Sequence, residues 1–179
     1  MPLAKSNQSL PHSREPHSPA GRTGRGVGAL CAVAALTFFV TGAGMLEGHA
    51  IYPSWRTLAT FAGFAEYHTE YGQLLIVWLP LPLVIATIGV AWLIYRRPDG
   101  VPRGLAIAAL LAQLIVLVVT AALALPIQVE LGTPGHTPDQ IIAVVDRLIL
   151  VNYLREVPGL AVAAVFVVML VLAMRRRTR

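Results

Sequence analysis

Charged residues are scarce in this chain, and their scarcity excludes an ordinary water-soluble domain. Asp, Glu, Lys and Arg make up 13% of the 179 residues, about half of the roughly 25% found in typical soluble proteins. Hydrophobic residues make up 56%. Cys31 is the only cysteine, so no intramolecular disulfide can form, and cysteine usage does not indicate a redox compartment. An excess of apolar residues on this scale requires lipid as the solvent.

Catalytic nucleophiles are also rare. Ser54 is the only serine beyond the N-terminal tail, and Cys31 lies in the first apolar block, far from the histidines that follow that block. Neither a Ser/His/Asp nor a Cys/His arrangement is therefore supported. The sequence also contains no HExxH motif and no Glu-x-x-His pair, which excludes the usual zinc-protease and di-iron bundle signatures.

The apolar residues form long blocks rather than one face of an amphipathic helix, which indicates membrane spans. Crossing a hydrocarbon core of about 30 Å takes about 20 such residues. We predict an all-α fold, an integral membrane antiparallel four-helix bundle over 27–174 with amphipathic helical segments at its outer face. The expected spans are about 27–46, 74–95, 104–125 and 157–174, with outer segments 47–73 and 126–156. A cleaved signal peptide is the competing interpretation of the first block, but the long charged leader favours an uncleaved helix.

The basic residues gather on one side of the predicted spans. Eleven Lys and Arg residues fall on that side and three on the other, which places the first side in the cytoplasm. We therefore expect a multi-pass protein of the cell membrane with both termini cytoplasmic: a disordered basic tail over 1–26 and a basic end over 175–179. The net charge of +5 then reflects topology, and we expect no nucleic-acid partner.

Prolines and one capping motif predict where the helices bend and end. Pro80 and Pro82 predict a kink in the second span, and Pro126 is expected to end the third. Thr137-Pro-Asp-Gln140 combines a capping hydroxyl, a proline at the first helical position and Gln three residues after the cap, which predicts a helix start. A helix from there to Met174 would far exceed the membrane thickness, so we expect a bend at Pro158-Gly159.

Several polar residues share one depth near the outer edge of the hydrocarbon. Counted from the basic side at about 1.5 Å per residue, Glu47, Gln73, Asn152 and Arg155 all lie roughly 30 to 35 Å away. An ionisable group at this depth marks a functional site by default. We hypothesise that Arg155 pairs with Glu47 across the bundle; the alternative is that both side chains extend separately into the headgroups. Gln113, near the middle of the third span, is expected to form an interhelical hydrogen bond.

Carboxylate and imidazole groups recur together in two segments beyond the first span. His49, Glu66 and His68 are weak candidates for metal ligands, since metals need such groups on one surface. Helical spacing does not bring them together unless the chain unwinds at Gly48, and solvated interfacial side chains are the alternative. No motif assigns a cofactor, and the oligomeric state is left open. The aromatic residues Tyr52, Trp55, Tyr67, Tyr71 and Trp78 are expected to mark the outer interface, and Trp92 and Tyr95 the inner one.

Three segments resemble a family of small four-helix membrane proteins related to anthrone oxygenases. They are Gly44-Met-Leu-Glu47-Gly-His-Ala-Ile-Tyr-Pro53-Ser-Trp55, Leu125-Pro126-Ile-Gln128 and Asn152-Tyr-Leu-Arg155, within a likeness that covers about 27–174. The chain has Gln128 where the family has asparagine, and it lacks the family's aromatic residue before Asn152.

The resemblance implies an oxygenase or other oxidoreductase that acts on a hydrophobic aromatic or quinone-like molecule entering from the membrane. It also implies roles for four residues. Glu47 and His68 would transfer protons, whereas Asn152 and Arg155 would bind an oxyanion or enolate.

A non-catalytic membrane protein is the competing hypothesis. In that case the same polar layer only locks the helices together, or binds a lipid or a partner protein. The two hypotheses predict different structures. A catalytic site should open into a pocket of several hundred cubic ångströms beside Glu47 and Arg155, whereas a lock should leave that layer closed.

Overall fold

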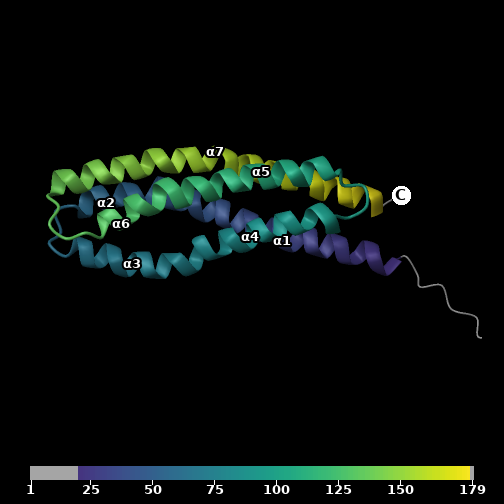
Figure 1. The fold of residues 1–179 in the computed structure, drawn as a ribbon, viewed down its shortest axis with the longest axis horizontal. Coiled ribbons are helices and arrows are strands. Elements are labelled where there is room, and N and C mark those ends of the chain that lie inside the picture. The colour runs from purple at the N-terminus through teal and green to yellow at the C-terminus, as the bar shows by residue number, and fades with distance from the viewer. Residues whose placement is uncertain (1–19, 178–179) are drawn as a thin grey trace, which may run out of the picture.

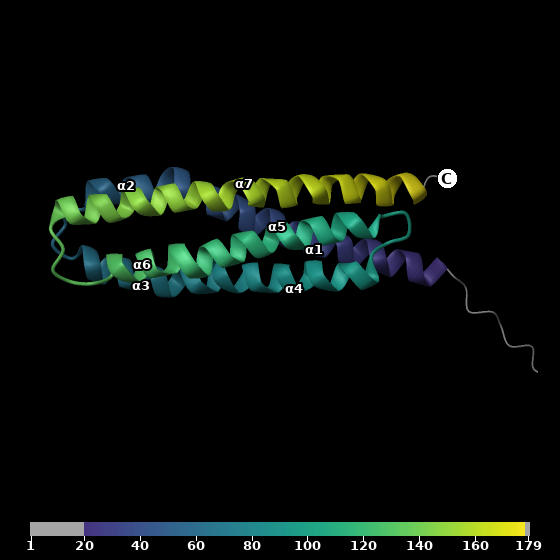
Figure 2. The same ribbon diagram turned by 45° about the horizontal axis from the view of Figure 1, so that its top comes forward.

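The computed structural model describes residues 20–177, and it confirms the all-α four-helix bundle. Four long helical segments run antiparallel to one another (Figures 1 and 2). Two of them contain a single π-helical turn, labelled η. The elements are α1 (Ala20–Leu46), η1 (Glu47–Ile51), α2 (Tyr52–Leu58), α3 (Phe64–Trp78), α4 (Pro80–Arg96), α5 (Arg103–Val119), η2 (Thr120–Ala124), α6 (Leu125–Leu131) and α7 (Pro138–Arg177).

Each of the four segments is long and apolar enough to cross a membrane. They are Gly26–Leu58, Phe64–Arg96, Arg103–Leu131 and Pro138–Arg176. Many of their apolar side chains are exposed on the outside of the bundle, where contact with lipid costs far less free energy than contact with water. The architecture is therefore that of a multi-pass membrane protein.

The two ends of the bundle differ in character. The start of α1, the α4–α5 connection and the end of α7 lie at one end, called here the basic end because it carries Arg96, Arg97, Arg103, Arg175 and Arg176 (Figure 1). The α2–α3 and α6–α7 connections lie at the opposite end, called here the site end. The first and last described helices thus begin and finish on the same side, as four crossings require.

Pro80 breaks the second segment where the sequence predicted a kink. Leu79, which separates α3 from α4, has φ −124° and ψ −66°, outside the helical region. Its N–H still donates to Leu75 O at 2.9 Å, and its carbonyl accepts from Leu83 N at 2.9 Å. The kink thus keeps these backbone groups paired, which is essential in lipid.

The two π turns each precede a proline. Pro53 lies at the start of α2, directly after η1, and Pro126 lies at the start of α6, directly after η2. A proline in a helix lacks an N–H and its ring collides with the carbonyl four residues earlier, and a widened turn relieves that conflict. The prediction that Pro126 ends the third segment is therefore wrong: the helix continues to Leu131.

The last helix begins as predicted but is not divided. Thr137 N donates to Gln140 Oε1 at 2.8 Å, and Gln140 N donates to Thr137 Oγ1 at 3.4 Å, which is a reciprocal capping box. α7 then runs for 40 residues with Pro158 inside it. The helix is continuous through Pro158-Gly159, so an outer helix and a span are not separate elements, and the bend expected there stays a prediction.

The boundary of the N-terminal tail also differs from the prediction. α1 begins at Ala20, so 20–26 are helical rather than disordered. Residues 1–19 of the predicted tail, and 178–179 of the basic end, lie outside the described residues.

The hydrophobic core is divided into two parts along the bundle. The basic half is filled by Leu30, Val90, Phe166 and other side chains that α1, α4, α5 and α7 supply. The site end is filled by side chains of α2, α3, η2, α6 and α7, with Trp55 fully buried. Between the two parts only Val40, Leu83 and Val116 form a small buried cluster. The interior of the bundle is therefore incompletely filled about halfway along its length.

Candidate functional site

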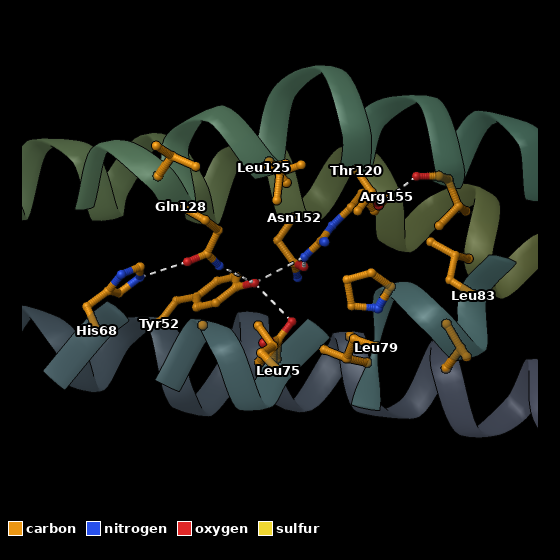
Figure 3. A pocket seen from close by; sticks show the side chains of 18 of the residues that line it. Tyr52, His68, Leu75, Leu79, Leu83, Thr120, Leu125, Gln128, Asn152 and Arg155 are labelled. Atoms are coloured by element: carbon orange, nitrogen blue, oxygen red, sulfur yellow. Dashed lines mark hydrogen bonds between the residues drawn. The ribbon is translucent and has the colours of Figure 1, made fainter. Parts of the chain in front are cut away.

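A cavity of about 530 Å³ extends from the gap between the two cores toward the α6–α7 connection at the site end. It lies inside the bundle, with walls from all four helical segments, and its lining combines apolar side chains with a polar group at one end (Figure 3). The apolar lining includes Val40, Leu75, Leu79, Leu83, Val116 and Leu125; the polar lining includes Glu47, Tyr52, His68, Gln128, Asn152 and Arg155. The predicted layer of polar residues thus borders an open space.

Tyr52 is the centre of the polar group. Its hydroxyl donates to Glu47 Oε2 at 3.0 Å and accepts from Gln128 Nε2 at 3.2 Å and from Arg155 Nη2 at 3.3 Å. Figure 3 shows the Tyr52 ring extending between Gln128 and Arg155. One phenol oxygen therefore joins η1, α2, α6 and α7.

The π turn explains why Tyr52 reaches Glu47. In a regular α-helix, residues five apart point about 140° away from each other. Here the Tyr52 N–H donates to the Glu47 carbonyl and closes a π turn, which brings position i+5 back to the same side of the helix. Thr120 and Leu125 are related in the same way by η2, and both line the cavity.

Glu47 is buried, with 3% of its surface exposed. Tyr71 supplies its second partner, since the Tyr71 hydroxyl donates to Glu47 Oε1 at 3.4 Å. Each carboxylate oxygen thus accepts one phenol hydroxyl. A buried carboxylate is tolerated only when such donors replace its lost hydration.

His68 extends the network along α3. Its Nε2 lies 2.8 Å from Gln128 Oε1, an acceptor, so Nε2 carries the proton in this arrangement. Gln128 therefore receives a hydrogen bond from His68 through its oxygen and gives one to Tyr52 through its nitrogen. Only 2% of His68 is exposed. The network places this imidazole at the wall of the cavity rather than in solvent.

Aromatic packing fixes the position of these groups. The Trp55 ring contacts three neighbours, with centroid separations of 5.1 Å to Tyr52, 4.8 Å to His68 and 5.4 Å to Tyr71. Phe64 stacks on the other side of His68 at 5.9 Å. The prediction that Tyr52 and Trp55 mark the outer membrane interface is wrong, because both are fully buried in the bundle. Tyr52 belongs to the network, and Trp55 packs against it.

Arg155 has donors that the protein does not use. Its Nη2 donates to Asn152 Oδ1 and to the Tyr52 hydroxyl. The Nε atom is buried without a hydrogen-bond partner, the one side-chain atom of this kind among the described residues. A buried N–H of a cation without a hydrogen-bond partner is energetically costly. Asn152 itself packs directly on Gly48, whose missing Cβ leaves the space that the amide fills.

The predicted pairing of Glu47 with Arg155 is only indirect. The two residues form no direct ion pair in the described part of the chain, and the Tyr52 hydroxyl bridges them instead. The alternative, separate extension into the headgroups, is also wrong, since both side chains turn into the bundle and line the cavity. The residue count from the basic side placed Glu47 and Arg155 in the same layer, but it did not reveal that the Tyr52 phenol lies between them.

The candidate metal ligands do not converge. His49 Nε2 lies 2.6 Å from Glu156 Oε1 on α7, His68 binds Gln128, and Glu66 is exposed on α3. No group of three or more His, Cys, Asp or Glu side chains among residues 20–177 is placed to hold a metal ion. A metal site built from His49, Glu66 and His68 is therefore not supported by their geometry.

The structure brings together all four predicted site residues at the cavity: Glu47, His68, Asn152 and Arg155. Sequence reasoning missed two that connect them, Tyr52 and Gln128. Gln128 carried a signal, because it stood at a motif position of the resemblance. The signal for Tyr52 was its place beside Pro53, since a proline within a helix favours a widened turn.

Fold and site together define a class: a multi-pass membrane protein with four helical segments and an internal cavity whose polar end carries a buried carboxylate, a buried imidazole and an arginine. No family model, curated protein sequence or solved structure matches the chain. The resemblance to the anthrone oxygenase-like family therefore stays a prediction, and the site has to be interpreted from its own geometry.

Proposed function

We propose that this protein takes a hydrophobic molecule with a polar head from the bilayer into its cavity and acts on it as an oxygenase-like oxidoreductase. The observation that carries the proposal is the cavity of about 530 Å³, apolar along most of its wall and polar at one end. Pockets for small molecules measure about 300 to 1,000 Å³ and combine apolar walls with a few convergent polar groups. The presence of this cavity supports a binding site over a layer closed by its own side chains.

The apolar wall suits an aromatic or quinone-like body. Leu75, Leu79 and Leu83 line the cavity from α3 and α4, opposite Leu125 of α6 (Figure 3). Leu125 and the neighbouring Val129 line the cavity and are also 48% and 67% exposed on the outside of the bundle. An edge that faces both lipid and cavity supports entry of the ligand from the membrane.

Arg155 suits an oxygen that becomes negative during the reaction. Its charge and its unused donors lie at the polar end, and the bond to Asn152 fixes the direction of the guanidinium. Preorganised donors of this kind stabilise an enolate or oxyanion more strongly in a water-poor site than in water. Asn152 is then a positioning residue, whereas Arg155 contacts the ligand.

Glu47 is the first candidate for the proton acceptor, and His68 is the second. The Tyr52 hydroxyl links Glu47 to Arg155, so a proton leaving a ligand at Arg155 has a short path to the carboxylate. His68 communicates through the Gln128 amide, which passes protons less readily than a hydroxyl. The resulting electron-rich anion would react with dioxygen as the co-substrate of an oxygenase.

The proposed placement is the cell membrane, with the basic end in the cytoplasm and the cavity near the outer face. The excess of arginine at the basic end supports it, because cytoplasmic loops are enriched in Lys and Arg.

A non-catalytic role is the second candidate, favoured by one observation. The hydrogen bonds around Tyr52 join all but one of the four helical segments directly, and His68 adds the remaining one through Gln128. A network of this kind holds helix ends together in a membrane whether or not a reaction occurs.

Turnover of anthrone separates the two candidates. The purified full chain in lipid nanodiscs is mixed with anthrone and dioxygen, and formation of anthraquinone and water is followed by absorbance. We expect Glu47→Gln and Arg155→Ala to lower the rate about 100-fold or more, while Glu70→Gln, an exposed carboxylate on α3, leaves it unchanged. Full activity in folded Glu47→Gln and Arg155→Ala protein would remove the catalytic assignment, and absence of turnover in the wild type would remove anthrone as the substrate.

A further inference from the structure

A second polar group lies at the inner end of the same cavity. Gln113 of α5 lines the cavity, and only 3% of its surface is exposed. The predicted interhelical hydrogen bond is wrong, because the Gln113 amide has no hydrogen-bond partner among the described residues. The amide atoms of Gln113 are not among the fully enclosed unpartnered atoms of the described residues, so the amide faces the cavity, where a bound group would satisfy it.

Its neighbours supply no partner either. Val40, Leu83 and Val116 form the small cluster that borders this part of the cavity, and all three are apolar. The nearest polar lining residue along α5 is Thr120, whose hydroxyl already donates to Val116 O at 2.7 Å. The amide is therefore available to a group that enters the cavity.

Gln113 lies closer to the basic end of the bundle than Arg155 does. Gly100 packs against Arg176, so the start of α5 and the end of α7 are at the same height. Gln113 is about 15 Å along α5 from Arg103, whereas Arg155 is about 30 Å along α7 from Arg176, at 1.5 Å per residue. The cavity thus has hydrogen-bonding groups about 15 Å apart, with apolar walls between them.

We propose that the ligand is an elongated apolar molecule with hydrogen-bonding groups at both ends, one held by Arg155 and the other by Gln113. This inference rests on the proposed binding function and narrows its ligand class. A compact molecule with oxygens on one side would leave Gln113 unsatisfied. The class is instead an extended apolar body that carries an anionic or carbonyl oxygen at its head and a hydroxyl or carbonyl at its far end.

Linear acids provide the test, because a carboxylate stands in for the oxyanion and the chain length is adjustable. An extended chain advances about 1.2 Å per bond, so 12-hydroxydodecanoate places its hydroxyl about 15 Å from its carboxylate. The probes are dodecanoate and octanoate, each with and without a terminal hydroxyl, titrated calorimetrically into the full chain in nanodiscs. Comparison of wild type with a variant cancels the difference in how the probes partition into lipid.

For the twelve-carbon acids, the measured quantity is the ratio of the affinity with the terminal hydroxyl to the affinity without it. We expect this ratio to be about fivefold to tenfold larger in the wild type than in Gln113→Met, which is the effect of one neutral hydrogen bond. The eight-carbon acid should show no such gain, since its hydroxyl does not reach the amide. Gln140→Met, the same change at an exposed position at the start of α7 and outside the cavity lining, is the matched control and should retain the gain.

Stability gives an independent measurement. If the amide serves a ligand rather than the fold, Gln113→Met removes an unpaired polar group, and the ligand-free protein should melt about 2 to 4 °C higher. Melting at a lower temperature than the wild type would show that Gln113 holds helices together, and it would overturn the inference.

The outcomes separate this inference from the proposed function. An equal hydroxyl gain in Gln113→Met and wild type, or an equal gain for both chain lengths, overturns the inference. If dodecanoate binds and Arg155→Met abolishes that binding, the proposed binding function stands even then. If dodecanoate does not bind the wild type, both the inference and the proposed binding function are refuted.

Discussion

Replacement of Tyr52 by Phe tests the centre of the polar network. The change removes one oxygen that makes three hydrogen bonds, to Glu47 at 3.0 Å, to Gln128 at 3.2 Å and to Arg155 at 3.3 Å. The ring itself stays, and so does its packing against Trp55. The experiment therefore isolates the hydroxyl from the aromatic core around it.

The expected loss of stability follows from those three bonds. Two of them involve charged groups at about 1.5 to 3 kcal/mol each and one is neutral at about 1 kcal/mol. Part of the loss is recovered, because Glu47 keeps Tyr71, Arg155 keeps Asn152, and the two opposite charges become free to approach each other. We expect a net destabilisation of about 2 to 3 kcal/mol, or a melting temperature lower by about 4 to 12 °C.

Thermal unfolding in detergent, followed by circular dichroism, measures the effect. Tyr95→Phe is the matched control, since Tyr95 is 76% exposed near the basic end and its ring remains available to Arg103. A Tyr52→Phe protein that melts within 1 °C of the wild type would refute the reasoning, because it would mean that the charges do not depend on the phenol oxygen.

Three further predictions concern the space around the network. Gly48→Ala should destabilise the protein by about 1 to 3 kcal/mol in thermal unfolding, because the new Cβ would collide with the Asn152 amide; unchanged stability would contradict the close packing. Gly44→Leu should reduce dodecanoate binding at least tenfold without unfolding the chain, since Gly44 lines the cavity and an added Cβ meets no atom within 4 Å; Gly42→Leu, equally unobstructed but not on the cavity wall, should bind normally. Gln140→Ala should cost about 1 kcal/mol, half of the capping box at the start of α7, whereas Glu70→Ala, an exposed change within α3, should cost less than about 0.5 kcal/mol in the same assay.

Much of the fold followed from hydropathy and proline chemistry. Apolar blocks identified the four helical segments, Pro80 identified the break between α3 and α4, and Thr137 and Gln140 identified the start of α7. These features are local, so the sequence carries them directly. Helix ends beyond the hydrocarbon were less predictable, because hydropathy reports where lipid solvates a helix and not where its hydrogen bonding stops.

The effect of proline was predictable only in part. Pro126 was expected to end a helix and Pro158 to bend one, yet the helix continues past Pro126 after a π turn, and α7 is continuous through Pro158. In a membrane, a break would expose backbone groups that nothing can satisfy, so the helix continues and adjusts locally. A rule taken from water-soluble helices overestimates the disruption.

The candidate site was predictable in its depth but not in its connections. Counting residues placed Glu47, Asn152 and Arg155 in one layer, and the structure places them around one cavity. Which side of a helix faces the bundle cannot be counted when almost every residue is apolar. Tyr52 illustrates this, because it reaches Glu47 only through a π turn that changes the helical phase by about a third of a turn.

A structure of the protein crystallised from a lipid phase with dodecanoate tests the central claim most directly. We predict a carboxylate oxygen about 3 Å from a guanidinium nitrogen of Arg155, with the alkyl chain between Leu75, Leu79 and Leu83. Dodecanoate found only on the outer, lipid-facing surface, beside a cavity closed by its own side chains, would contradict it.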